Sequence, residues 1–334
     1  MVIEDKLREN AALYPDKVAL VCGEKSLTYR QLYQAIKDKA DSMGDIRGRL
    51  IPIVAYSTVD FFITYFALHL TGAVAVPLHK DIPAKKLNDY AETLEQGIVP
   101  EEVADILFTT GTTGNAKAVM ISYQTIIANA ENLVLSQGFS HDVTFIINGP
   151  LNHIGSLSKV YPTIYVGGTI HVIDGMKDIK AFFTAIDDAP NKVATFLVPA
   201  AIRILITLWK KELIAVADKI DFVETGAAPL AATDMKLFCE LLPHSRLYNT
   251  YASTETGIIS TYDYNDGANL AGCVGHKMKH SSFFITADGY VACKGKTLMT
   301  GYWNDEEATR NVLKDGVIRT ADLGRIDEKG RLRL

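Results

Sequence analysis

The sequence predicts an α/β protein: layered α/β subdomains built on mostly parallel sheets, with a small C-terminal β-barrel-like subdomain. Three observations lead to this prediction. Helical and strand patterns alternate over the first half of the chain, short buried strands recur through the middle, and alternating strands with tight turns follow Ile258. We therefore expect a layered α/β body at 1–259 and a small β-subdomain at 260–334.

The first half of the chain alternates helices with strands. Thr28 and Gln31 have the spacing of a capping box, which predicts that a helix begins there. Such alternation is typical of parallel layers, because a crossover helix returns the chain to the same end of the sheet. The helices are expected at 3–13, 28–43 and 60–71, and the strands at 18–22, 51–56 and 73–78.

The same logic continues beyond residue 100. A strand at 104–110 leads into a turn rich in glycine and threonine, and then into a helix around 123–137. The pair Asp288-Gly289 predicts a hairpin within the C-terminal part. Further strands are expected near 143–147, 169–173, 195–199, 221–226 and 247–253.

Composition argues against two classes of partner. The chain has 334 residues, of which 48% are hydrophobic, and a formal net charge of −5 without a long basic run. A nucleic-acid polymer or an anionic membrane is therefore not expected as its main partner. Four scattered cysteines and an N-terminal segment without signal-peptide character favour the cytoplasm.

One segment imitates a membrane span. Residues 61–78 contain eighteen residues without a formal charge, enough for a short transmembrane helix. His69 and Gly72 interrupt the run, and its end is small and β-branched. We expect a buried helix followed by a buried strand in the core of the body.

The most informative stretch is 106–122, ILFTTGTTGNAKAVMIS. Gly111 and Gly114 let the backbone approach an anion closely. It is not a Walker loop, because Asn115 stands where that motif has lysine. Alone, the stretch is compatible with an anion site and with a plain turn in equal measure. Its candidate hydroxyl and ammonium donors are Thr109, Thr110, Thr112, Thr113 and Lys117.

This loop resembles the phosphate-loop signature TSGTTGxPKG of the acyl-adenylate-forming (AMP-binding) enzyme superfamily, which includes acyl-CoA synthetases, peptide-synthetase adenylation domains and luciferases. Ala116 replaces the proline and Ala118 the last glycine of the signature. Neither change removes a donor, so we expect altered loop stiffness with binding retained. Tyr123 stands where many members have histidine. The resemblance implies that the loop binds the triphosphate of ATP.

Two further segments resemble the family's nucleotide motifs in the same order. GAAPL (226–230) resembles the glycine-rich strand end, and NTYASTETG (249–257) resembles the YGxTE segment, with Ala252 in place of glycine. Alone, each would be a common turn or helix start. The resemblance implies that adenine lies against Gly226, Ala227, Ala228 and Tyr251, that Thr254 contacts phosphate, and that Glu255 binds Mg²⁺. It also places Asn249 and Thr250 in the ATP site.

The C-terminal stretch 301–332 resembles the family's terminal signature. It places Asp322 where an aspartate grips both ribose hydroxyls, with Ala321 in place of a glycine. Family members continue past this point into a small mobile lid domain with a lysine that promotes adenylation. Because the chain ends at Leu334, we expect the C-terminal lid domain to be absent and the isolated chain to adenylate weakly.

PLNHIGSL (150–157) resembles the PLxHxxG segment of acyl- and aryl-CoA ligases. The resemblance implies that His153 lies near the acyl carboxylate and that His153 and Gly155 belong to the acid pocket. A single histidine is more often a core residue. The segment has no aspartate to pair with an ammonium group, which favours a carboxylic acid without an α-amino group.

The C-terminal part contains four residues of the types that bind zinc. Cys273, His276, His280 and Cys293 have the spacing C-x2-H-x3-H-x12-C. The spacing is not that of a standard zinc finger, and short Cys/His matches are frequently accidental. We therefore expect no zinc site there.

Together the resemblance implies ATP-dependent activation of a small carboxylic acid to an acyl-adenylate, followed by thioester formation with CoA. ATP, Mg²⁺ and CoA (or a phosphopantetheine thiol) would be its cofactors. The o-succinylbenzoate–CoA ligase branch is one candidate, because residues 117–119 and PLNHIG resemble its variants. The catalytic residues would be Lys117, His153, Thr254 and Glu255.

Two alternatives stay open. An acid-activating ligase that loads a carrier protein would carry the same motifs, because the thiol acceptor leaves no mark in this part of the chain. A degenerate nucleotide-binding protein without activity is suggested by Ala116, Ala118, Ala252 and Ala321. The retained Lys117, Thr254, Glu255 and Asp322 favour an enzyme.

Overall fold

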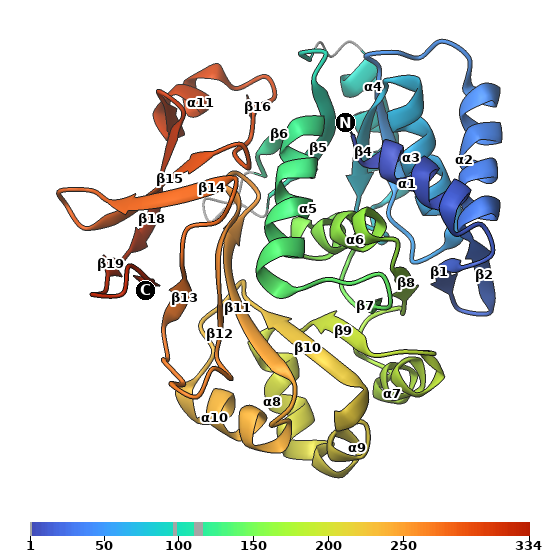
Figure 1. Ribbon diagram of the computed structural model, residues 1–334. Coiled ribbons are helices and arrows are strands. Elements are labelled where there is room, and N and C mark those ends of the chain that lie inside the picture. Colours follow the sequence, from blue (N-terminus) through green and yellow to red (C-terminus); the bar gives the residue numbers. More distant parts are fainter. Residues whose placement is uncertain (1, 96–98, 110–115) are drawn as a thin grey trace.

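Two β-sheets enclose a central layer of helices in the computed structural model, which describes residues 2–95, 99–109 and 116–334 (Figure 1). One sheet has eight strands and the other five, and the C-terminal strands form sheets of three and four. The mixed α/β class is therefore confirmed. Within the described residues, the C-terminal strands form two separate sheets and not one barrel-like sheet.

The eight-stranded sheet is parallel except at its two edges. Neighbouring strands from β11 to β1 run in the same direction, and the edge strands β12 and β2 are antiparallel. Its strands, in spatial order, are β12 (Gly257–Asp263), β11 (Arg246–Ser253), β10 (Ile220–Thr225), β9 (Val193–Phe196), β7 (Thr144–Ile147), β8 (Thr169–Val172), β1 (Val18–Cys22) and β2 (Lys25–Thr28).

The five-stranded sheet is parallel on one side and antiparallel on the other. Its order is β16 (Gly301–Tyr302), β6 (Ala118–Ser122), β5 (Val103–Phe108), β4 (Val74–Leu78) and β3 (Leu50–Val54). The smaller sheets are β13 (Cys273–Gly275), β20 (Leu332–Arg333) and β19 (Arg325–Ile326), and β14 (Ser281–Ile285), β15 (Tyr290–Gly295), β18 (Val317–Leu323) and β17 (Leu313–Lys314).

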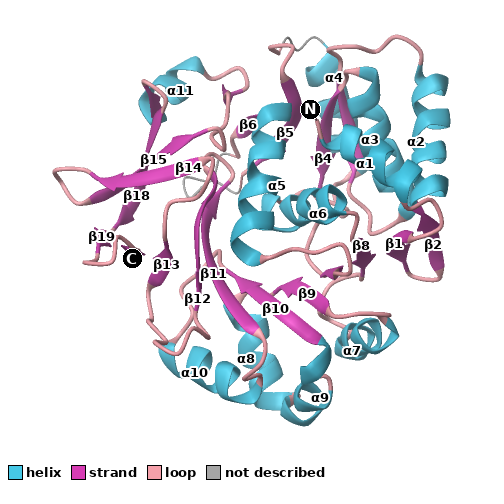
Figure 2. Ribbon diagram, in the orientation of Figure 1, coloured by secondary structure: helices cyan, strands magenta, loops and turns pink. Residues whose placement is uncertain are grey.

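The helices fall into three groups (Figure 2). The central layer is α1 (Ile3–Leu13), α2 (Tyr29–Met43), α3 (Val59–Thr71), α5 (Tyr123–Gln137) and α6 (Ile154–Val166). The outer face of the large sheet carries α7 (Ile179–Asp188), α8 (Pro199–Leu208), α9 (Lys210–Ala215), a 3₁₀ turn (Ala217–Lys219) and α10 (Ala232–Leu241). The remaining two are α4 (Ala84–Glu95), against the five-stranded sheet, and α11 (Glu306–Val312).

Capping residues explain where the central helices begin and end. Thr28 accepts a hydrogen bond from the Gln31 amide and forms the predicted capping box at the start of α2. Ser122 accepts from the Thr125 amide at the start of α5. Gly138, in the left-handed conformation, ends α5 at the predicted position.

The apolar segment 61–78 is buried in the body, as predicted. It forms α3 and β4, which are joined at Gly72 in the left-handed conformation. In the part of the chain that the structure describes, no helix has the length and hydrophobicity that crossing a membrane requires.

The stretch before the 123–137 helix is not a bare turn, because residues 118–122 form β6, antiparallel to β5. The segment 109–117, called the phosphate-loop segment below, therefore joins two antiparallel strands. The proposed division after residue 259 remains a prediction, and β12 of the large sheet spans that position.

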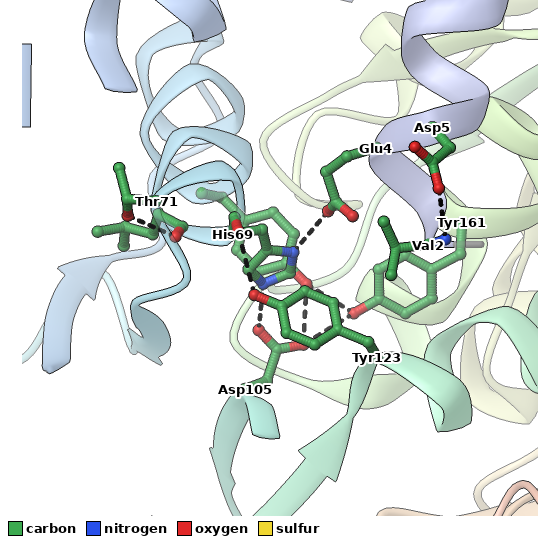
Figure 3. Close-up of polar contacts among 10 residues, drawn as sticks. Val2, Glu4, Asp5, His69, Thr71, Asp105, Tyr123 and Tyr161 are labelled. Atoms are coloured by element: carbon green, nitrogen blue, oxygen red, sulfur yellow. Dashed lines mark hydrogen bonds and ion pairs between the residues drawn. The ribbon is translucent and has the colours of Figure 1, made fainter. Parts of the chain in front are cut away.

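A buried polar network ties the central helices to β5 (Figure 3). The His69 ring lies 2.7 Å from Glu4 Oε1 and 3.0 Å from Asp105 Oδ1, and all three side chains are almost completely buried. Burial alone would lower the pKa of His69, but the carboxylates of Asp105 and Glu4 outweigh it and raise the pKa to about 10. His69 is therefore an imidazolium at neutral pH.

Three tyrosine hydroxyl groups complete this network. Tyr65 and Tyr161 donate to Asp105 Oδ2 at 2.9 and 3.3 Å. Tyr123, at the position where family members have histidine, donates to the backbone oxygen of His69 at 3.1 Å. Because β5 leads directly into the phosphate-loop segment, the network fixes the strand from which that segment starts.

Candidate active site

A cavity of about 400 Å³ gathers residues from segments that are far apart in the sequence. The predicted site residues that line it are Thr109, Lys117, His153, Gly155, Gly226, Ala227, Thr250, Thr254 and Glu255. Ala228, Asn249, Tyr251 and Asp322 are not among its lining residues. Thr110, Gly111, Thr112, Thr113 and Gly114 lie outside the described residues.

One end of the cavity is built around Lys117 and Glu255. The backbone amide of Thr109 donates to the Lys117 carbonyl at 2.9 Å, which closes the neck of the phosphate-loop segment. Lys117 Nζ lies 4.6 Å from the centroid of the Tyr302 ring, and the Tyr302 hydroxyl donates to Glu255 Oε1 at 2.9 Å. Burial and the neighbouring Glu255 raise the pKa of Tyr302, so this hydroxyl stays a donor at neutral pH.

The end of strand β10 brings bare backbone to the cavity. A Cβ atom on Gly226 would lie 2.8 Å from the Thr250 carbonyl oxygen, so only glycine allows this approach of β10 to β11. Ala227 follows with φ of 64°, a left-handed conformation that costs an alanine about 1–2 kcal/mol. Such strain is typical of functional sites, where surrounding structure enforces it.

Tyr251 and Asp322 meet beside the cavity. The Tyr251 hydroxyl donates to Asp322 Oδ2 at 2.7 Å, which joins β11 of the large sheet to β18. Burial raises the pKa of Tyr251. Asp322 itself is exposed. The Asn249 side chain instead donates to Tyr264 and to the Cys273 carbonyl, so it anchors β11 to its neighbours.

His153 stands at the start of α6. Its Nδ1 accepts a hydrogen bond from the Gly155 amide at 3.0 Å and caps the helix. Partial desolvation of the ring lowers its pKa, so the imidazole is neutral at neutral pH. With Nδ1 occupied as an acceptor, the ring proton is on Nε2, which is then a hydrogen-bond donor.

The cavity also contains residues that the sequence did not single out. Lys159 and Glu224 form an ion pair of 2.6 Å, and Phe196 and Tyr302 supply aromatic walls. Tyr302 lies in the stretch 301–332 that resembles the family's terminal signature. Glu224 could have been noticed as well, because it is a charged residue inside the buried strand 221–226.

The described residues contain no group of three or more His, Cys, Asp or Glu side chains arranged to hold a metal ion. Cys273 and Cys293 are buried and unpaired, and His280 Nε2 lies 2.6 Å from Glu131. A larger hollow of about 750 Å³ over β1, β8 and α7 is lined by none of the predicted site residues.

The family model described as AMP-binding enzyme matches residues 7–96 and 88–303 of the chain. The chain belongs to the AMP-binding enzyme family. The matched residues include the eight-stranded and five-stranded sheets, most of the central helical layer and the whole cavity lining. Asp322 lies beyond the matched residues.

Curated relatives of this AMP-binding enzyme include two acid–CoA ligases. The chain is 26% identical to indoleacetate–CoA ligase of Aromatoleum aromaticum over 99% of this chain and 78% of the relative. It is 24% identical to 2-succinylbenzoate–CoA ligase of Bacillus cereus over 98% and 76%, respectively. The fold matches the N-terminal subdomain of Klebsiella oxytoca NpsA, solved with anthranilyl-AMSN, with a TM-score of 0.86, 20% identity and coverage of 100% and 99%.

Proposed function

We propose that this AMP-binding enzyme activates a small carboxylic acid with ATP and transfers the acyl group to the thiol of CoA. In the first step a carboxylate oxygen attacks the α-phosphorus, the bond to the bridging oxygen breaks, and pyrophosphate leaves. In the second step the thiol sulfur attacks the acyl carbonyl, AMP leaves with the bonding electrons, and the thiol proton goes to solvent. The products are an acyl-CoA thioester and AMP.

The observation that carries the proposal is the shared cavity. Lys117, Thr254 and Glu255 line the part next to the neck of the phosphate-loop segment, and His153 and Gly155 also line it. Triphosphate and acid would therefore meet in one chamber. Adenylation needs no covalent enzyme intermediate, so holding both reactants in line and neutralising phosphate charge are the main catalytic tasks.

Each end of the cavity has a role in this proposal. The Lys117 ammonium, held over Tyr302, would bind the leaving phosphates together with the loop hydroxyls and the Thr254 hydroxyl. The Nε2–H of neutral His153 would donate to the substrate carboxylate or to the α-phosphate. Adenine would lie against the backbone of 226–228 and Tyr251, and Asp322 would accept from the ribose hydroxyls.

The residues present fit a magnesium ion whose ligands come partly from the protein and partly from the phosphates of ATP. Mg²⁺ prefers oxygen and is usually bound by one or two carboxylates plus substrate phosphates. Glu255 supplies such a carboxylate, and the Tyr302 hydroxyl fixes its orientation. When bound, the ion would neutralise charge on the leaving pyrophosphate.

The four unpaired cysteines suit a reducing compartment, and we place the enzyme in the cytoplasm.

Thermal unfolding with nucleotides tests the metal role of Glu255. Mg-ATP at a hundred times its Kd should stabilise the protein by about 2.7 kcal/mol. Glu255→Gln should lose most of the magnesium-dependent part of this stabilisation and keep the response to AMP. Glu240→Gln, an exposed change on α10, is the matched control. Equal responses of all three proteins to Mg-ATP would remove Glu255 from the metal site.

The reaction itself is tested with a panel of carboxylic acids. Acid-dependent release of pyrophosphate from ATP, followed by CoA-dependent release of AMP, is the expected result. Pyrophosphate release that proceeds to thioester only with a phosphopantetheine carrier would replace CoA by a carrier protein. A protein that neither binds ATP or AMP nor releases pyrophosphate with any acid would refute the proposal.

A further inference from the structure

A buried ion pair forms part of the cavity wall. Lys159 on α6 and Glu224 on β10 lie 2.6 Å apart, with side-chain exposures of 2% and 1%. Both line the same cavity as His153 and Gly155. Burying two charges carries a large desolvation cost, which is offset only when the remaining hydrogen-bonding positions are also satisfied.

These positions are not satisfied by the described part of the chain. Glu224 Oε2 and the Ser158 hydroxyl are buried without a hydrogen-bond partner among the described residues. The bond to Glu224 uses one of the three N–H groups of Lys159. A buried, unpaired carboxylate oxygen is costly, and such groups in native proteins call for an explanation. A ligand in the cavity would supply the missing donor.

The rest of this part of the wall is apolar. Ile154, Phe196 and Ile258 line the cavity, and Lys159 Nζ lies 5.6 Å from the centroid of the Phe196 ring. Cβ atoms built on Gly155 and Gly226 would come within 3.9 and 3.8 Å of opposite edges of that ring. The absence of side chains at both glycines leaves the ring edges accessible, which suits a flat aromatic ligand.

The charges of the pair select the polar group that such a ligand carries. A second carboxylate would bring no donor for Glu224 Oε2, and an ammonium would bring no acceptor for Lys159. An ether oxygen would accept from Lys159 but leave Glu224 Oε2 unpaired. A hydroxyl donates to Glu224 and accepts from Lys159 at once.

We propose that the acid activated by this enzyme is a hydroxylated aryl acid whose hydroxyl group binds between Lys159 and Glu224. This inference rests on the proposed function, because it assumes that the acid occupies this cavity. It deepens that function by naming the substrate class. In the opposing explanation, the ion pair only supports the fold and has no influence on which acid binds.

Binding of non-hydrolysable acyl-sulfamoyl-adenosines to the full chain distinguishes the two. Benzoyl, phenylacetyl and cinnamoyl series are each measured by calorimetry in unsubstituted, hydroxy, methoxy and carboxy forms, with the substituent at each ring position. AMP is titrated in parallel as a measure of the nucleotide half of the site. At least one hydroxy compound should bind ten times more tightly than its unsubstituted and methoxy counterparts, the range expected for a hydrogen bond to a buried charge.

The double variant Lys159→Met/Glu224→Leu replaces the pair with apolar side chains of similar size, which buried ion pairs often tolerate. It should still bind AMP and should lose the tenfold preference for the hydroxy compound. Arg203→Met/Asp234→Asn removes an ion pair outside the cavity and should keep the preference.

The outcomes separate this inference from the proposed function. A wild-type protein that binds AMP and the unsubstituted compounds, but shows no preference for any hydroxy compound, overturns the inference and leaves the proposed function standing. A preference that survives in the double variant also overturns it. A protein that binds neither AMP nor any acyl-sulfamoyl-adenosine refutes both.

Discussion

The change His69→Gln removes a cation from between two buried carboxylates. In the native protein the ring lies 2.7 Å from Glu4 and 3.0 Å from Asp105 and is completely buried. Loss of one partner of a buried ion pair costs about 3–5 kcal/mol. Because the Tyr65 and Tyr161 hydroxyls still reach Asp105 and glutamine retains a donor, we expect a loss of about 3 kcal/mol at pH 7.

The pH dependence of the free energy of unfolding tests the protonation of His69 more directly. The pKa of His69 rises from 6.5 in the unfolded chain to about 10 in the folded protein. A raised pKa stabilises the protonated native state, so the contribution is fully present below pH 6.5 and is lost as the pH rises through 10. Between these values the free energy of unfolding should fall by about 1.4 kcal/mol per pH unit on account of His69.

Urea unfolding at pH 7, 8 and 9 measures this slope. Over these two units His69 should contribute a decrease of about 3 kcal/mol in the wild-type protein that is missing from His69→Gln. His244→Gln, a change at an exposed position, should follow the wild type. If wild type and His69→Gln lose stability in parallel over this range, His69 does not hold a proton in the native state and the reasoning fails.

Two further predictions concern the close contact between two backbone segments at Gly275 and the binding of AMP. Gly275 and Gly267 both have positive φ, but a Cβ on Gly275 would lie 1.8 Å from the Thr261 carbonyl oxygen, whereas one on Gly267 would meet nothing within 4 Å. Gly267→Ala should therefore cost about 1 kcal/mol in chemical denaturation and Gly275→Ala at least about 3 kcal/mol, and equal costs would contradict a steric role for Gly275. Tyr251→Phe removes the hydrogen bond to Asp322 and should weaken AMP binding about threefold to tenfold in calorimetry, so an unchanged AMP affinity would show that this bond does not orient Asp322 for ribose.

Local signals in the sequence predicted many of the elements of the fold. The capping box at Thr28 and the C-terminal glycine at Gly138 fix the ends of α2 and α5, because caps act through neighbouring backbone groups. Strand β6 was missed, since residues 118–122 become a strand only by pairing with β5 and with β16, which is about 180 residues further on.

The candidate site likewise contains residues that local motifs predict and residues that only the fold brings together. Residues in recognisable motifs, such as Lys117, His153 and Glu255, were predicted from the sequence and line one cavity. The pairing of Lys159 with Glu224 was not predicted, because 65 residues separate them. A charged residue inside a buried strand indicates that Glu224 has a partner but not which residue it is. Contacts of this kind depend on how α6 packs over the large sheet, which no short window of sequence specifies.

The contact between Tyr251 and Asp322 has a consequence for how the molecule responds to its nucleotide. The two side chains come from different sheets, and their hydrogen bond spans the junction between the body and the four-stranded C-terminal sheet. A nucleoside held by both would act as a clamp across that junction. Amides of β15 and β18 should then exchange with deuterium more slowly when AMP is bound, although they lie outside the cavity.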